Sequence, residues 1–144
     1  MFENKRGAKT MTIKYRSGYK YVLLEADPFQ LDIRPSHQIE TDYASLDING
    51  ILIVKPKYAW DGCSGPTRDD NTNMQGGLVH DVLCQFMREG LLPKSYRKAV
   101  NEELKRICIE DGMWEFRANY YKWGVDTRIG INCARHTKEI KFAP

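Results

Sequence analysis

The chain has 144 residues, of which 42% are hydrophobic and 11% aromatic, and its 22 basic and 19 acidic residues give a formal net charge of +3. This composition excludes a disordered chain, and the length suits a single domain, residues 1–144, with its own core. The near balance of charge gives no strong nucleic-acid signal. No apolar run approaches the roughly 18 residues of a membrane span, and the polar N-terminus lacks a secretory signal, so we expect a soluble protein made in the cytoplasm.

The first part of the chain predicts β-strands. A β-rich run, "YKYVLLEA", is followed by two β-rich stretches, 39–48 and 51–60, on either side of Asn49-Gly50. This dipeptide favours a hairpin whose turn has positive φ at both residues. Because proline lacks a backbone N–H, Pro56 in the later stretch indicates an edge strand or a bulge.

Three helical patterns follow. Residues from roughly 75 to 89 carry a wide apolar face, and Gly90 provides a natural end. Ser95 is the expected N-cap of the second helix, which Gly112 ends. The third helix, about 114–128, is rich in aromatic residues. We expect these side chains to lie in the core and not on a partner or lipid surface: Trp114, Tyr120, Tyr121 and Trp123.

Strands and helices in separate blocks predict an α+β fold, in which a β-rich N-terminal half with a hairpin precedes about three helices. The division that we expect is a β-rich part, a long loop, a helical part and a polar tail: 12–60, 61–77, 75–130 and 131–144. Loops of that length inside a compact domain are usually functional or mobile.

The candidate site combines the long loop with the first helix. "YAWDGCSGP" contains Asp61, and "VHDV" places His80 beside Asp81. Adjacent residues of a helix point about 100° apart, so the two side chains face different partners. A neutral imidazole takes a proton from water, and carboxylates with loop carbonyls bind a hard cation. On the neighbouring helix, Asn101 is the candidate that orients the imidazole.

The order Asp-Gly-Cys-Ser, His-Asp and a helical polar residue about two dozen positions on resembles secreted phospholipases of the A-two type, in their bacterial and fungal forms. In that family a histidine activates the attacking water, and a loop and an aspartate bind calcium. The resemblance implies these assignments: His80 as general base, Asn101 at the orienting position, Asp61 and Asp81 as Ca²⁺ ligands, and Gly62, Cys63 and Ser64 as the site loop. We expect Trp60 and Cys84 to pack beside the site.

Two departures bear on activity. The family has an acid where this chain has Asn101, and an amide does not stabilise an imidazolium. The same exchange in a His-Asp dyad elsewhere costs about 10⁴ in rate. The family cysteine three residues before the histidine is here Gly77, so that disulfide is absent, and whether Cys63 approaches Cys84 stays open.

A wider pattern, Trp-Asp-Gly-x-Ser-x-Pro, "LVHD", "RKAVNEEL" and an aromatic helix, is similar to an uncharacterised family of tailed-phage and prophage proteins over about residues 45–130. Its members are often encoded near tail or lysis genes. The resemblance implies a phage product of the host cytoplasm, associated with the virion or with lysis, whose phospholipase-like activity is weak or lost and whose partners are other phage structural proteins. The alternative is an active calcium-dependent lipid or ester hydrolase that acts on the host envelope.

Three further interpretations stay open. His80 and Asp81 are a satisfied structural pair with His80 packed under Trp60; or His80 and Cys84, at i and i+4, bind zinc with another cysteine; or Cys63 is a nucleophile with His80 as its base.

Overall fold

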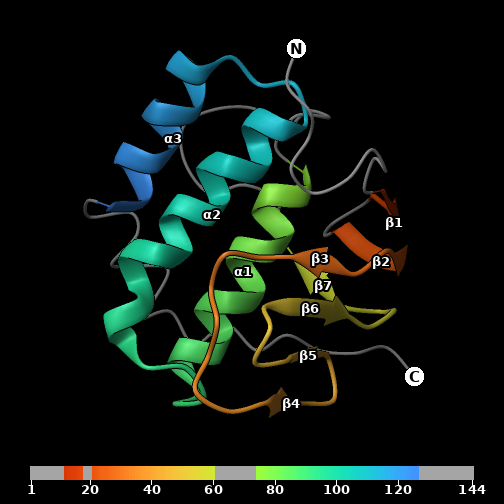
Figure 1. Cartoon of the computed structure of the whole chain (residues 1–144). Helices are drawn as coiled ribbons and strands as arrows, with labels where there is room; N and C mark the ends of the chain where they lie inside the picture. The colour runs from red at the N-terminus through yellow and green to blue at the C-terminus, as the bar shows by residue number, and fades with distance from the viewer. Residues whose placement is uncertain (1–11, 18–20, 61–73, 127–144) are drawn as a thin grey trace.

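The structure is a computed structural model, and it describes residues 12–17, 21–60 and 74–126. Within these ranges seven strands precede three α-helices and one 3-10 turn, which confirms the predicted α+β fold and its β-rich N-terminal half (Figure 1). The bounds are β1 Ile13–Arg16, β2 Tyr21–Ala26, β3 Phe29–Gln30, β4 Ile39–Glu40, β5 Ala44–Leu46, β6 Ile51–Val54, β7 Ala59–Trp60, α1 Met74–Arg88, η1 Lys94–Tyr96, α2 Arg97–Glu110 and α3 Glu115–Asp126.

The strands form two small antiparallel sheets, in the orders β1-β2-β7 and β3-β6-β5-β4. In the second sheet Leu52 lies opposite both Phe29 and Leu46, and this buried row faces the core. The prediction for Pro56 is wrong, because β6 lies between two other strands and Pro56 begins a turn after it. This turn passes the chain to the first sheet and includes Lys57 at a φ of 80°.

The hairpin at Asn49-Gly50 is confirmed, but its turn differs from the predicted one. Gly50 has a φ of 86°, whereas Lys57 is the one non-glycine residue with positive φ in the described ranges, so Asn49 has a negative φ. Asp47 explains the difference: its Oδ1 accepts the backbone N–H groups of Asn49 and Ile51, both at 2.9 Å. The hairpin loop is therefore closed in part by the Asp47 side chain, whereas the predicted two-residue turn would be closed by backbone hydrogen bonds alone.

Helix α1 occupies the centre of the molecule, with the sheets on one side and α2 on the other, and α2 lies between α1 and α3 (Figure 1). Twelve of its 15 residues are buried. It begins at Met74, one residue before the start that the apolar pattern predicted, and the end of the expected loop, which overlapped the predicted helix, is helical. A Cβ at Gly76 would lie 2.7 Å from Sγ of Cys108, so glycine here permits the close approach of α1 and α2.

The ends of the helices follow the sequence in part. Gly90 and Gly112, both at positive φ, lie two residues past the last residues of α1 and α2, in keeping with the predicted helix ends. Ser95 is not an N-cap: it lies inside η1, and Tyr96 precedes α2 without a side-chain cap. The 3-10 turn supplies the backbone bond instead, from the N–H of Arg97 to the carbonyl of Lys94. Among the described residues, none of the helices is long and apolar enough to cross a membrane.

The expectation that the aromatic residues near α3 lie in the core is wrong for Trp114 and Trp123, which are 81% and 61% exposed. The side chains of Tyr120 and Tyr121 lie outside the described set. Small and flexible residues fill the space between α2 and α3 instead, in a buried cluster of Leu104, Cys108, Met113 and Ala118.

Candidate functional site

His80 lies in the second turn of α1, and only 4% of it is exposed. Its Nε2 is 2.8 Å from Oδ1 of Asn101, a residue of α2 that is itself 2% exposed. The two residues are 21 positions apart in the sequence, and the packing of α1 on α2 brings them together. Asn101 therefore lies where an orienting group for the imidazole was expected.

The far end of the Asn101 amide is held by α3. Nδ2 of Asn101 donates to Oδ1 of Asp126 at 2.7 Å, and Nζ of Lys122 donates to the other carboxylate oxygen at 2.5 Å. Burial acts to raise the pKa of Asp126, but hydrogen bonds from Lys122 and Asn101 and the charges of Lys122 and Arg97 outweigh it and lower the pKa. A continuous polar chain thus runs from His80 through Asn101 to an ionised carboxylate.

Cys84, one turn after His80, packs against the imidazole. Its Sγ is 3.7 Å from Nδ1 and 3.8 Å from Nε2. Since these distances are nearly equal, the sulfur lies beside the ring and is not directed at one nitrogen. The thiol is free and buried. The expected packing of Cys84 beside the candidate base is therefore present.

Trp60 is fully buried at the end of β7, and its ring makes edge and tilted contacts with Tyr15 and Tyr21 at centroid distances of 5.9 and 5.6 Å. Its Nε1 has no acceptor among the residues that the structure describes. Trp60 therefore joins the first sheet to the core and ends the strand that leads to Asp61 in the sequence.

Asp81 faces a different part of the molecule from His80, as the helical geometry predicted. Tyr58, just before β7, is fully buried, and burial followed by the charge of Asp81 raises its pKa well above the usual value. The Tyr58 hydroxyl donates to Oε1 of Gln85 at 3.2 Å. His80 is thus directed to α2, and Asp81 is half-buried on the side of the strands.

The described residues by themselves do not form a metal site. Asp61, Gly62, Cys63 and Ser64, which the resemblance assigns to calcium binding and the site loop, lie outside the described ranges. Within those ranges no three His, Cys, Asp or Glu side chains converge, so the zinc interpretation has no third ligand there. Asp81 contributes one carboxylate, whereas Ca²⁺ takes six to eight oxygen ligands.

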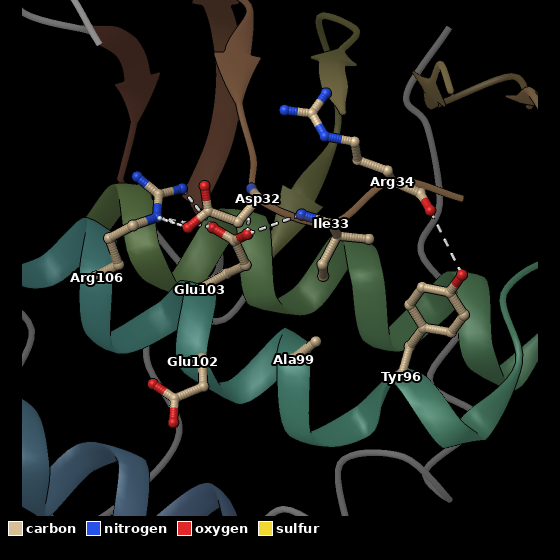
Figure 2. Close-up of a pocket in the computed structure, with 8 residues that line it drawn as sticks. All are labelled: Asp32, Ile33, Arg34, Tyr96, Ala99, Glu102, Glu103 and Arg106. Atoms are coloured by element: carbon tan, nitrogen blue, oxygen red, sulfur yellow. Dashed lines mark hydrogen bonds and ion pairs between the residues drawn. The ribbon is translucent and has the colours of Figure 1, made fainter. Parts of the chain in front are cut away.

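A second buried charge lies on α2. Glu103 is 2% exposed; its Oε2 accepts the backbone N–H groups of Asp32 at 2.6 Å and Ile33 at 3.2 Å, and its Oε1 accepts from Arg106 (Figure 2). These bonds hold α2 against the segment after β3. They border a pocket of about 450 Å³ in which Glu102 pairs with Lys122, Glu103 pairs with Arg106, and Arg34 donates to the backbone carbonyl of Asn49. We therefore interpret this region as a structural clamp.

Sequence reasoning missed Asp126, Lys122 and Glu103. Glu103 had a usable signal, because it shares one helical face with Val100, Leu104 and Ile107, all of which are buried. Asp126 and Lys122 had none beyond their i, i+4 spacing, because their role depends on how α3 crosses α2.

Comparison of the chain with models of protein families, with curated proteins and with solved structures finds no match. The two resemblances stay predictions, and the geometry around His80 carries the functional argument.

Proposed function

We propose that the chain is a hydrolase of esters that uses His80 as its general base, within a virion- or lysis-associated phage protein that acts on lipid of the host envelope. The observation that carries this proposal is the hydrogen-bonded chain His80–Asn101–Asp126, with donor–acceptor distances of 2.8 and 2.7 Å; His80 and Asn101 are buried and Asp126 is partly exposed. A histidine that acts as general base needs a fixed ring orientation and a negative charge nearby that stabilises the imidazolium. Asn101 holds the ring in its orientation, and the carboxylate of Asp126 provides the negative charge.

The proposed reaction uses the nitrogen that does not face Asn101. Nδ1 of His80 accepts a proton from water, and the water oxygen attacks the carbonyl carbon of the ester. When the tetrahedral intermediate collapses, the alkoxide leaves and takes the proton from Nδ1, so water and ester become acid and alcohol. No step is assigned to calcium, because the described residues contribute one carboxylate to the set that the resemblance implies.

Because Asp126 lies behind Asn101, the amide at position 101 is not sufficient reason to expect that activity is lost. An amide alone leaves the imidazolium without a nearby negative charge, but Asp126 lies one hydrogen bond further on. Through the amide the two groups are at most about 8 Å apart, where a unit charge contributes about 2 kcal/mol at an effective dielectric constant of about 20. Lys122 offsets part of this, so we expect that the amide at position 101 does not abolish catalysis.

The test is hydrolysis of phospholipid vesicles and of a soluble ester by the purified chain, with and without Ca²⁺, for wild type and His80→Gln. Glutamine can still donate to Oδ1 of Asn101 but is not a base. Turnover that needs His80 supports the proposal, and stimulation by Ca²⁺ would support the role of Asp61 and Asp81. Wild-type turnover equal to that of His80→Gln would sink the proposal.

A second candidate is a virion component without activity, in which the same network is structural. The 4% exposure of His80 favours it, since so small a surface offers little to a substrate. Mass spectrometry of purified particles tests this candidate, which fails if the chain is absent from them. Stability data complete the comparison: a purely structural His80 predicts a destabilised His80→Gln protein together with no turnover in wild type.

A further inference from the structure

We infer that Asp126 is a positioning residue for His80: by holding the Asn101 amide in one orientation, it fixes the imidazole as the tautomer with its proton on Nε2. The inference deepens the proposed function, since it concerns how the same base is prepared. It rests on two hydrogen bonds, one that connects α1 to α2 and one that connects α2 to α3.

The first step concerns the acceptor. Asp126 receives hydrogen bonds from Lys122 at 2.5 Å and from Asn101 at 2.7 Å, and Arg97 donates to its backbone carbonyl at 3.2 Å. The ion pair with Lys122 and the nearby charge of Arg97 keep the carboxylate ionised, in keeping with its lowered pKa. An ionised carboxylate only accepts hydrogen bonds, so the group of Asn101 that faces it must be the NH₂.

The second step concerns the amide. The two ends of an asparagine amide are nearly equal in size, but one end donates and the other accepts. With its NH₂ directed at Asp126, Asn101 presents Oδ1 to His80, and Nε2 of the imidazole must then donate. The neutral ring consequently has its lone pair on Nδ1, where the proposed base is needed.

The third step concerns the alternative. If position 126 did not require a donor, Asn101 could turn over and present its NH₂ to Nε2. The ring would then accept at Nε2 and place its proton on Nδ1, and this tautomer cannot act as a base through Nδ1. Asp126 therefore acts on His80 through Asn101, without touching it.

The experiment measures the tautomer directly by long-range ¹H–¹⁵N NMR of the full chain, above the pH at which His80 is protonated. The chain has three histidines, and the signals of His80 are those that His80→Gln removes. Wild type should show a protonated Nε2 and an unprotonated Nδ1. Asp126→Asn, whose amide can pair with Asn101 in either orientation, should add the Nδ1–H tautomer, and Asp126→Ala serves the same comparison if Asp126→Asn does not fold.

Lys122→Gln is the matched control, since it removes the ion pair between Lys122 and Asp126 but leaves the carboxylate of Asp126 as an acceptor for Asn101. We expect it to keep the wild-type tautomer. A wild-type Nδ1–H tautomer, an unchanged tautomer in folded Asp126 variants, or an equal change in Lys122→Gln would each overturn the inference. Because the readout needs no substrate, an inactive protein with the expected tautomers would contradict the proposed function alone.

Discussion

The removal of Glu103 tests how α2 is held in place. Glu103→Ala leaves the backbone N–H groups of Asp32 and Ile33 without their acceptor and removes one carboxylate from Arg106. A buried donor without a partner costs about 1–3 kcal/mol. Arg106 keeps its ion pairs with Glu110 at 2.9 Å and Asp32 at 3.5 Å, so the loss of its contact with Glu103 adds little to the cost. We expect the free energy of unfolding to fall by about 3–4 kcal/mol.

Glu102→Ala is the matched control, because Glu102 is the preceding residue of the same helix and also carries a carboxylate. Its side chain is 52% exposed and 3.5 Å from Lys122, so its loss should change the free energy of unfolding by no more than about 0.5 kcal/mol. Urea unfolding of both variants and wild type, followed by circular dichroism, measures the difference. Equal costs for the two substitutions would refute the clamp.

Three other substitutions test the packing and charges around the site. Gly76→Ala should lower the free energy of unfolding by about 1–3 kcal/mol in the same urea assay, because its Cβ would meet Cys108; an unchanged midpoint would contradict the close approach. Burial, and to a smaller extent the charge of Glu110, raises the pKa of Asp111 from 3.8 to about 7. Between these two pH values the folded chain holds a proton that the unfolded chain has lost, so the free energy of unfolding falls as the pH rises from 3.8 to about 7. Asp111→Asn should therefore stabilise the chain above about pH 7 and have little effect near pH 4, and thermal unfolding at the two pH values would expose the opposite trend. Asn101→Asp should place a second carboxylate against Asp126, lower the free energy of unfolding by about 2–3 kcal/mol and fail to raise hydrolysis, whereas a faster enzyme would show that the amide had weakened the site.

Much of the fold could be predicted because local chemistry determined it. The apolar face of α1, the glycines after α1 and α2, and the hairpin at Asn49-Gly50 each follow from short-range patterns. The details that failed depend on single local contacts: Asp47 completes the hairpin loop, and a 3-10 turn before α2 takes the place of a Ser95 cap. Such effects are not periodic, so a pattern search does not find them.

The candidate site divides in the same way. The pairing of His80 with Asn101 could be anticipated because each lies among apolar residues on neighbouring helices, which must pack face to face. Asp126 could not be anticipated, since its contact with Asn101 requires the crossing of α3 over α2. The exposure of Trp114 and Trp123 was missed for a related reason: the smaller Ala118 and Met113 already fill that contact.

The central claim is that His80 is a catalytic base, and the comparison of two glutamine substitutions tests it most directly. His80→Gln removes the base while it keeps a donor toward Asn101, and His37→Gln changes an exposed histidine outside the site. A general base contributes about 10²–10⁴ in rate, so we predict that ester hydrolysis falls at least 100-fold in the first variant and stays at the wild-type rate in the second. Equal rates in both variants, with both proteins folded, would contradict the account.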